Sequence, residues 1–333
     1  MILRLDLGEN GYDVVLERGC LARAGELLDL NRKVLVVTDS GVPKEYAETV
    51  AAACKRAVVV TVPEGEKSKS FPGLESLLSR MLAEGFTRGD CVVAVGGGVV
   101  GDLSGLAAAL YMRGIDFYNV PTTLLSQADS SIGGKTGIDL DGVKNIVGAF
   151  KQPKKVLIDP ETLSTLPPRQ IAAGSAEIIK AGLIADAELF SLYENEKSDD
   201  TVAVLSRALA VKGAVVEADE KESGLRRILN FGHTVGHGIE SVTGLYHGEC
   251  VALGMIPMCA PAVRDRLLKV LLRVGLPTEV RADPDEVYAN LLHDKKAAGG
   301  KITAVFVDEP GSCKQISLSP ESLREQIGMV VKK

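Results

Sequence analysis

Short apolar runs alternate with amphipathic stretches along the first half of the chain. The runs are rich in β-branched residues and lack polar alternation, as in parallel strands buried on both faces; they cover residues 33–38, 57–62, 91–95 and 117–120. Between them, apolar residues recur at helical spacing over residues 43–55 and 71–84. Strands that alternate with helices predict crossover units, and therefore an α/β domain with a parallel, Rossmann-like sheet.

The second half has a different pattern, which is mainly helical. Helices are predicted over residues 169–185, 201–218, 234–242, 249–258 and 283–296, with short strands at 302–307 and 315–318. Prolines punctuate residues 152–160, where we expect the change of domain. The 333 residues suit two domains of about 150 each, which we place at residues 1–155 and 156–333.

Composition narrows the class of protein and of partner. Apolar residues make up 46% and charged residues 25%, as in folded globular proteins, and the net charge is 38 − 44 = −6. An acidic chain is a poor general binder of polyanions, so we expect neither nucleic acid nor a membrane surface as partner. The apolar stretch 91–112 contains Asp102 and five glycines, which argues against a membrane span. The six cysteines form no C-x-x-C motif, so we expect free thiols and a cytoplasmic protein.

Glycine is abundant, with 35 residues, an excess that indicates tight turns and close approach of the backbone to a ligand. Residues 96–102 read GGGVVGD and match G-x-G-x-x-G between a predicted strand and a predicted helix. Such a loop lets a pyrophosphate approach the backbone at a helix N-terminus. Alone the motif is weak, and a glycine turn without a ligand stays open. Asp39 lies at the end of the first strong strand. Its carboxylate either accepts hydrogen bonds from the hydroxyls of a ribose or serves only the local turn.

Three of the four histidines lie within fifteen positions: His233, His237 and His247. On a helix, the spacing of four places His233 and His237 on one face. Glu177 lies among apolar residues of a predicted helix, with Lys180 on its face, and a buried carboxylate needs a partner. Imidazole and carboxylate together suit zinc with an open position. No H-E-x-x-H motif is present, so a zincin protease is disfavoured; the alternative is ordinary histidines that bind no metal.

Residues 121–137 combine hydroxyls, Asp129, glycines and Lys135, and Lys144 and Asn145 follow shortly after. We interpret this segment as a polar loop. Further cations lie near the other motifs: Arg113, Lys180, Lys212, Arg226, Lys295 and Lys296. So many cations favour a substrate with carboxylate and phosphate groups, although each one alone could be a solvated surface charge.

Taken in order, these motifs resemble the 3-dehydroquinate synthase family of sugar-phosphate cyclases. The matching segments, dense between residues 95 and 255, are GGGVVGD, YMRG, PTTLLSQADSSIGGKTG, KNIVGAFKQP, TLPPRQIAAGSAEIIKAG, EADEKESGLRRILNFGHTVGH and HGECVALGM. The resemblance implies a Rossmann-like NAD domain followed by a mainly helical metal-binding domain, in a homodimer. It also implies conversion of 3-deoxy-D-arabino-heptulosonate 7-phosphate to 3-dehydroquinate and phosphate in the shikimate pathway. The implied steps are transient NAD oxidation, phosphate elimination, re-reduction, ring opening and intramolecular aldol closure.

The resemblance also implies site residues. The implied ligands of the metal, which is zinc or alternatively cobalt, are Glu177, His233 and His247. Cofactor contacts fall to Asp39, Glu64, Gly65, Glu66, Lys67, Ser68, Lys69, Gly98, Val99, Val100, Gly101, Asp102, Thr122, Thr123, Lys135, Lys144, Thr162, Leu163, Ser164 and Thr165. Catalytic roles fall to Lys135, His237, Asn230 and Asp129. Substrate contacts fall to Arg113, Lys144, Asn145, Lys180, Lys212, Arg226 and, in preference to Lys295, Lys296.

Three other functions stay open. A metal-dependent polyol dehydrogenase would share the architecture but release NADH, and the many cations exceed what a simple alcohol needs. Another sugar-phosphate cyclase would lack the carboxylate-binding set, which Lys212, Arg226 and Asn230 argue against. A non-catalytic NAD-binding protein would have broken metal ligands. The segment 255–276 has fewer residues than in many relatives, and Glu64 stands where many relatives have Asp. We expect that neither difference abolishes the enzymatic activity.

Overall fold

The computed structural model describes residues 1–295 and 302–333, and the chain divides into an N-terminal unit, Met1–Leu166, and a C-terminal unit, Pro167–Lys333. Residues 152–160, where the change of domain is expected, contain a short strand, β9 (Lys155–Ile158). This strand pairs with two others of the N-terminal unit. The unit therefore continues through β9 and the 3-10 helix Pro160–Thr165.

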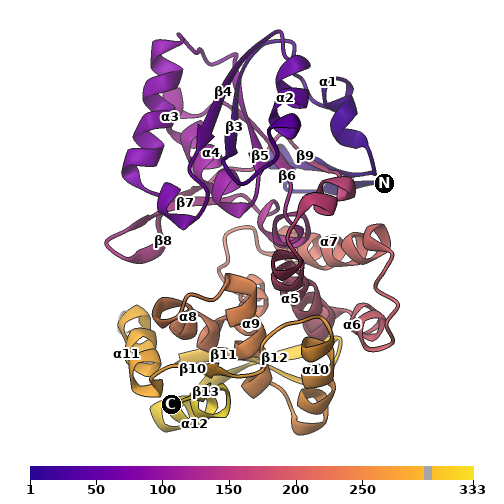
Figure 1. Cartoon of the computed structure of the whole chain (residues 1–333), viewed down its shortest axis with the longest axis vertical. Coiled ribbons are helices and arrows are strands. Elements are labelled where there is room, and N and C mark those ends of the chain that lie inside the picture. Colours follow the sequence, from indigo (N-terminus) through magenta and orange to yellow (C-terminus); the bar gives the residue numbers. More distant parts are fainter. Residues whose placement is uncertain (296–301) are drawn as a thin grey trace. The chain divides into compact units, whose positions relative to one another are not determined.

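A seven-stranded sheet forms the centre of the N-terminal unit (Figure 1). Its order is β1-β2-β9-β6-β5-β3-β4, and every pair is parallel except β1 with β2. The bounds of its remaining strands are β1 (Ile2–Leu5), β2 (Tyr12–Leu16), β3 (Lys33–Asp39), β4 (Arg56–Val62), β5 (Cys91–Gly96) and β6 (Asp116–Pro121). The chain runs outward from β3 to β4 and then crosses back to β5, so the topological switch lies between β3 and β5.

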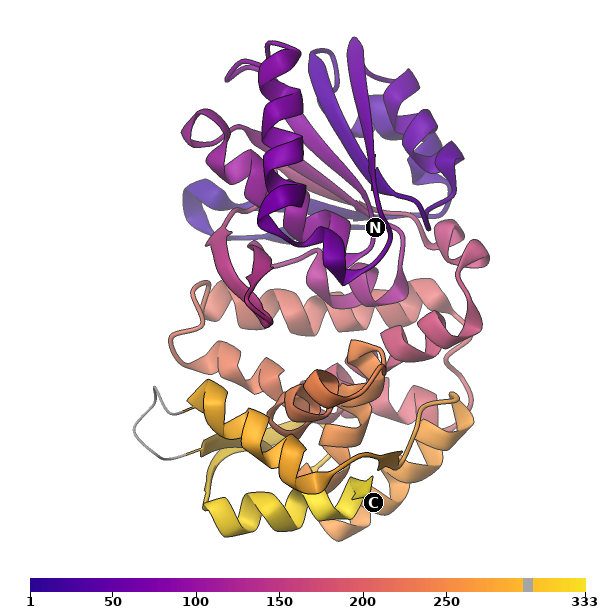
Figure 2. The same cartoon turned by 60° about the vertical axis from the view of Figure 1, so that its left-hand side comes forward.

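Helices cover both faces of this sheet, which explains the lack of polar alternation in its strands (Figures 1 and 2). Leu35 and Val37 of β3 pack toward α3 (Phe71–Ala83) and α4 (Gly98–Leu110). Val34 and Val36 pack on the other face toward α1 (Ala24–Leu27) and α2 (Lys44–Ala52). All four side chains are fully buried.

The segment interpreted from sequence as a polar loop, residues 121–137, is partly ordered into regular structure. Residues Ser126–Ser130 form a turn of π-helix, and Lys135 begins a hairpin of β7 (Lys135–Leu140) and β8 (Val143–Phe150). The loop interpretation was therefore wrong for these parts. The hairpin pairs only within itself and is separate from the seven-stranded sheet (Figure 2).

The C-terminal unit is mainly helical, as the sequence predicts. Its central helix is α5 (Pro168–Ala185), in which every residue from 172 to 184 is buried. The other helices are α6 (Ala187–Glu194), α7 (Thr201–Ala218), α8 (His233–Val242), α9 (His247–Met255), α10 (Pro261–Arg273), α11 (Pro284–Lys295) and α12 (Pro320–Val330), with 3-10 turns at Leu225–Asn230 and Ile256–Met258. Two small sheets complete the unit, formed by β10 (Val280–Arg281) with β13 (Val331–Lys332) and β11 (Ile302–Glu309) with β12 (Ser312–Leu318).

The expected fold class is confirmed: a Rossmann-like parallel sheet is followed by a mainly helical part. Within residues 1–295 and 302–333, no helix combines the length and the apolar character that crossing a membrane requires.

Candidate active site

The segments expected to bind the cofactor all follow strands of the parallel sheet. Asp39 ends β3, residues 64–69 follow β4, the glycine loop follows β5, Thr122 and Thr123 follow β6, and residues 162–165 follow β9. Because the strands are parallel, their carboxyl ends lie at one edge of the sheet, here called the carboxyl edge. This edge, beside the switch point between β3 and β5, is where open α/β sheets bind ligands.

Asp39 and the segment after β4 are neighbours at the carboxyl edge. The carboxylate Oδ1 of Asp39 accepts a hydrogen bond from the Gly41 amide at 2.8 Å, so the side chain also stabilises its own turn. The Glu64 amide donates to Ser40 Oγ at 3.0 Å. A Cβ at Gly41 would lie 2.5 Å from the carboxyl carbon of Glu64, so glycine is what allows this close approach.

The glycine loop joins β5 to α4 and is covered by residues that follow β6. Gly97 precedes the first helical residue, Gly98. A Cβ at Gly97 would lie 3.1 Å from Thr123 Cγ2, and one at Gly98 would lie 3.1 Å from Ser130 Oγ. Glycine at these positions therefore lets the segment after β6 approach the loop closely, while the backbone amides at the N-terminus of α4 form the arrangement that accepts a pyrophosphate.

Lys69 joins three parts of the carboxyl edge. Its ammonium lies 2.8 Å from Asp102 Oδ2 on α4 and 3.2 Å from Glu66 Oε1, and it donates to Asn145 Oδ1 on β8. Burial raises the pKa of Asp102 to about 6, and the Lys69 ammonium only partly opposes this effect. Burial disfavours the charge on Lys69, but Asp102 and Glu66 outweigh it and raise the pKa of the amine.

Gln127 ties the segment after β6 to the segment after β9. Its amide donates to the carbonyl oxygens of Pro121 and Asp159 and to Thr162 Oγ1, at 2.9 to 3.1 Å. Tyr46 of α2 lies 3.1 Å from the hydroxyl of Thr165. A small cavity behind the glycine loop is lined in part by Asp102, Lys135 and Lys151.

Four predicted site residues lie on the hairpin or beyond α4. Lys135 begins β7, and Lys144 and Asn145 lie on β8; all three are exposed. Asn145 has a positive φ of 54°, and its amide donates to Asp139 Oδ1 at 2.8 Å. Arg113 follows the C-terminal end of α4, a helix of 13 residues and therefore about 20 Å long, so it is far from the glycine loop at the other end.

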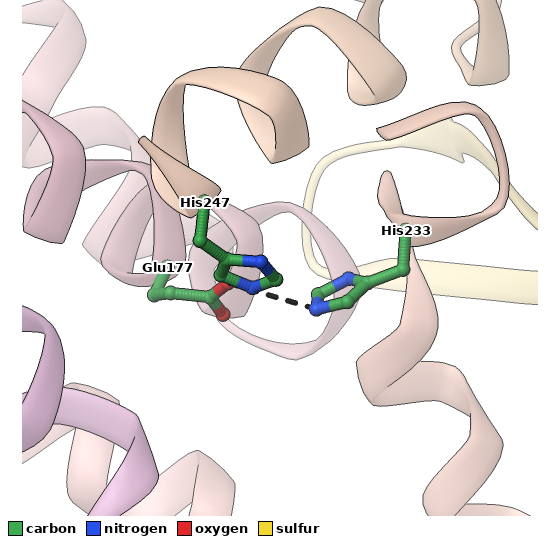
Figure 3. Close-up of side chains that lie close together, drawn as sticks. All are labelled: Glu177, His233 and His247. Atoms are coloured by element: carbon green, nitrogen blue, oxygen red, sulfur yellow. Dashed lines mark ion pairs between the residues drawn. The ribbon is translucent and has the colours of Figure 1, made fainter. Parts of the chain in front are cut away.

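In the C-terminal unit, three helices bring together Glu177, His233 and His247, here called the metal triad. Glu177 lies in the middle of α5, while His233 and His247 are the first residues of α8 and α9. Glu177 Oε1 lies 3.8 Å from His233 Nε2 and 3.6 Å from His247 Nε2. Figure 3 shows the carboxylate and both imidazoles pointing toward one another.

The second nitrogen of each imidazole has its own acceptor. His233 Nδ1 lies 3.1 Å from the Phe231 carbonyl oxygen, and His247 Nδ1 lies 3.0 Å from Glu240 Oε2. When Nδ1 carries the proton, Nε2 keeps a lone pair for a ligand. Both rings therefore direct the same kind of nitrogen toward Glu177.

The charges of the triad respond to burial and to Lys180. Lys180 Nζ forms an ion pair with Glu177 Oε2. Burial opposes ionisation of Glu177, but Lys180 and then the two histidines hold its pKa well below the usual range. Burial and Lys180 lower the pKa of His233. Burial also favours the neutral form of His247. The hydrogen bonds and negative charges of Glu177 and Glu240 have a larger effect in the opposite direction and raise the pKa of His247 to about 9.

The donor set fits a zinc-like divalent ion. Within the described residues, the buried carboxylate of Glu177 forms an ion pair with Lys180, and its Oε1 atom, which faces the two histidines, has no hydrogen-bond donor of its own. The ligand atoms of the triad lie within 4.8 Å of one another. Two ligands about 2.1 Å from a tetrahedral ion lie about 3.4 Å apart, close to the separations found here. Two imidazoles and one carboxylate also leave a fourth position open, as catalytic zinc sites do.

Glycines allow the three helices to approach closely enough to form the triad. A Cβ at Gly248 would lie 1.9 Å from the Ala173 carbonyl oxygen on α5. A Cβ at Gly254 of α9 would lie 1.8 Å from the Gly232 carbonyl oxygen, next to His233. Part of the glycine excess therefore serves helix packing, in addition to the turns and ligand contacts expected from the sequence.

Further predicted residues of the C-terminal unit are buried cations or lie next to the triad. Lys180, Lys212 and Arg226 are each at most 8% exposed. The rings of His237 and His233 have centroids 5.2 Å apart. Asn230 Nδ2 donates to Glu222 Oε1 at 2.8 Å. Lys296 lies outside the described residues.

Several polar residues that organise the site were not among the sequence predictions. The Asp219 carboxylate accepts hydrogen bonds from the amides of Ser223, Gly224 and Arg226. Arg169 forms a bidentate ion pair with Glu249 at 2.7 and 2.8 Å, which connects α5 to the start of α9. Asp219 and Glu249 lie inside the matching motifs, but only the folded backbone reveals what they bind.

Family models and known relatives match most of the chain. The family model described as 3-dehydroquinate synthase N-terminal matches residues 59–173, and the one described as 3-dehydroquinate synthase C-terminal matches residues 174–297. A 3-dehydroquinate synthase of Caulobacter vibrioides is 45% identical over 90% of both chains. One of Pelobacter propionicus is 41% identical over 99% of both chains.

Solved structures of similar fold include cyclizing synthases and, at lower identity, dehydrogenases. A 2-deoxy-scyllo-inosose synthase complexed with carbaglucose-6-phosphate, NAD+ and Co2+ has a TM-score of 0.89 and 26% identity, over 98% of this chain and 99% of that one. The 2-epi-5-epi-valiolone synthase of Streptomyces hygroscopicus, with NAD+ and Zn2+ bound, has a TM-score of 0.87 and 29% identity over 95% of both chains. A glycerol dehydrogenase of Sinorhizobium meliloti has a TM-score of 0.63 and 17% identity, and so shares the fold alone.

Proposed function

The chain belongs to the 3-dehydroquinate synthase family, and from this premise we propose how its residues divide the work of the reaction. The enzyme converts 3-deoxy-D-arabino-heptulosonate 7-phosphate to 3-dehydroquinate and phosphate, and it depends on NAD and a divalent metal. The observation that carries this function is the metal triad, which is intact in a chain that matches the family along most of its length.

The N-terminal unit binds NAD at the carboxyl edge, and the C-terminal unit binds the metal through Glu177, His233 and His247. When bound, NAD accepts and later returns a hydride, and the metal lowers the pKa of a hydroxyl that it contacts. Asp39 and the segment 64–69 suit the ribose hydroxyls, and the glycine loop, from Gly98 to Asp102, suits the pyrophosphate. Thr122, Thr123 and residues 162–165 complete the cofactor site, to which Lys135 and Lys144 also contribute.

The hairpin binds the phosphate of the substrate. Lys135 and Asn145, helped by His237, supply its hydrogen bonds and positive charge. Arg113 lies at the other end of α4, so its contribution to this phosphate would come from the second copy of a dimer. The bond from Lys69 to Asn145 supports this role, because it joins the hairpin to the carboxyl edge. Asp129 lies in the π-helical turn that follows β6, and it orients the cofactor or a substrate hydroxyl.

The carboxylate of the substrate binds among the buried cations. Lys180, Lys212 and Arg226 face the carboxylate and the ring hydroxyls, together with Lys296. The burial of Lys180, Lys212 and Arg226 supports the role, because cations shielded from water attract a carboxylate more strongly than solvated cations do. His237 lies one helical turn after His233, where it and Asn230 relay protons at the reacting hydroxyl.

A balanced assay tests this function directly. Purified, metal-loaded protein is mixed with NAD and 3-deoxy-D-arabino-heptulosonate 7-phosphate, while phosphate, 3-dehydroquinate and NADH are measured together. Equal amounts of phosphate and 3-dehydroquinate without net NADH are the expected result. Net NADH would indicate a polyol dehydrogenase, and turnover only of sugar phosphates that lack the carboxylate would indicate another cyclase.

We further propose that the enzyme is a homodimer. The turn that carries Arg113 also exposes Leu110 and Met112, at 50% and 44%, an apolar surface that a second copy would cover. Because one chain has a mass of 35.2 kDa, a dimer has a mass of 2 × 35.2 = 70.4 kDa by light scattering. Replacing Leu110 and Met112 together by Asp should yield the monomer mass; an unchanged mass would place the interface elsewhere.

We also propose that the enzyme works in the cytoplasm. All six cysteines are free, which is the usual state in a reducing compartment. Cell fractionation tests the location: the chain should be found with cytoplasmic markers, and recovery with a membrane or secreted fraction would contradict the proposal.

A further inference from the structure

Glu240 is a largely buried acid that contacts a residue of the metal triad. It lies on α8, three residues after His237 and seven before His247. Its Oε2 atom lies 3.0 Å from His247 Nδ1, and its side chain is only 10% exposed. The contact connects α8 with the first residue of α9, and so with the residue that faces Glu177.

We propose that Glu240 is a positioning residue for the metal: it accepts the Nδ1 proton of His247 and so holds Nε2 toward Glu177. The inference rests on the proposed metal site, which it deepens. A histidine ring can turn about its bonds and can carry its proton on either nitrogen. A carboxylate beside Nδ1 fixes both choices and makes Nε2 a stronger donor to the metal.

The two histidines of the triad differ in this respect. His233 Nδ1 is beside a neutral carbonyl oxygen, that of Phe231, whereas His247 Nδ1 is beside the carboxylate of Glu240. The carbonyl of Phe231 is part of the backbone and is kept by any side-chain substitution at Phe231. The acceptor of His247 is a side chain and can be removed, so the role of Glu240 is open to a direct test.

Glu240 could instead be a ligand of a second metal ion, and the test has to distinguish this role from positioning His247. His237, Glu240 and His247 also lie close enough to hold a metal ion by themselves. In that arrangement Glu240 would be a ligand of a second ion. His247 Nδ1 cannot donate a proton to Glu240 and bind a second metal at the same time, so the two roles predict different numbers of bound ions.

The test measures zinc affinity in the full-length protein by competition with a chromophoric chelator. Glu240→Ala should weaken zinc binding about tenfold to a hundredfold, the usual effect of removing such a partner. Glu240→Gln should have a smaller effect, because its amide oxygen still accepts the Nδ1 proton. Glu325→Gln removes a charge from an exposed position of α12 and should leave zinc affinity unchanged. The visible absorption of the Co2+ form should change in the same order.

Three outcomes would decide against the proposal or its basis. Zinc affinity within twofold of the unchanged protein in both Glu240 variants would overturn it. Where Glu240→Ala fails to fold, Glu240→Gln alone decides, because an uncharged acceptor should still weaken zinc binding by more than about twofold. A second equivalent of zinc that disappears with Glu240 would make this residue a ligand instead. Glu177→Gln serves as the reference for the site: unchanged zinc binding there would reject the proposed metal site, whereas loss of zinc there alone would reject only the role of Glu240.

Discussion

The Cα atom of Gly248 packs directly against the main-chain carbonyl group of Ala173, so closely that a Cβ would lie 1.9 Å from its oxygen. Gly248 follows His247, and Ala173 lies one helical turn before Glu177. This contact therefore sets how near α9 comes to α5. It shows that the spacing of the metal triad is fixed by the backbone and not only by the ligands.

We expect Gly248→Ala to push α9 away from α5 and to lower the free energy of unfolding by about 3 kcal/mol. Urea denaturation measures the loss, and zinc content after dialysis measures the damage to the triad. Gly328→Ala is the matched control. A Cβ there meets open space on α12, so that variant should be more stable by about 0.5 kcal/mol. Equal effects at the two positions would contradict this packing argument.

Removing the metal should destabilise the protein as well as stop turnover. A ligand that binds only the folded state stabilises it by about 2.7 kcal/mol at a hundred times its dissociation constant. Calorimetry should therefore show a lower Tm after chelation and recovery when zinc is restored. In Glu177→Gln the metal-dependent rise in Tm should vanish, while NAD affinity should stay within about twofold because the cofactor segments belong to the other unit. A Tm unmoved by chelation would count against the triad.

The Lys69–Asp102 pair predicts a pH dependence of stability. The pKa of Asp102 is raised from 3.8 to about 6 in the folded protein, so the folded state binds this proton more tightly than the unfolded state. Asp102 therefore contributes a decrease in unfolding free energy as the pH rises from about 4 to about 6. Lys69→Met should raise this pKa further and extend the decrease to higher pH. Asp102→Asn should abolish this contribution, and superimposable pH profiles would refute the coupling.

Lys135 should matter for turnover and not for folding. Its side chain is exposed at the start of β7, so Lys135→Ala should change the unfolding free energy by no more than about 0.5 kcal/mol. Loss of a charged contact to the phosphate should reduce kcat/KM at least about a hundredfold. Lys55→Ala, at another exposed lysine of the same unit, should leave both quantities unchanged. A Lys135 variant that merely unfolds would remove the basis for its assignment.

The sequence predicts elements whose pattern is local. β3 and β5 are recognisable because their apolar residues are contiguous and β-branched, and α3 because its apolar residues recur at helical spacing. His233 and His247 are recognisable as a pair because histidine is rare in this chain and the two lie close in sequence. Glu177 stands 56 positions before His233, and only its apolar surroundings indicate that its carboxylate needs a partner; the family resemblance then assigns it to the same site as the histidines.

The remaining features depend on partners that the sequence does not reveal. β9 has only four residues and gains its stability from pairing with β2 and β6. The role of Gly248 depends on a carbonyl group 75 positions earlier. Glu240 has no apolar pattern around it that would mark it, because its significance lies in one hydrogen bond to a residue on another helix.

The place of β2 in the sheet also has a consequence for synthesis on the ribosome. β2 lies between β1 and β9, and the Leu21 amide near its end donates to Asp159, a residue 138 positions later. The first strands to leave the exit tunnel therefore wait for most of the N-terminal unit to be translated before they can join the sheet. During that interval β3, β4, β5 and β6 can already assemble, and the N-terminal hairpin closes the sheet last.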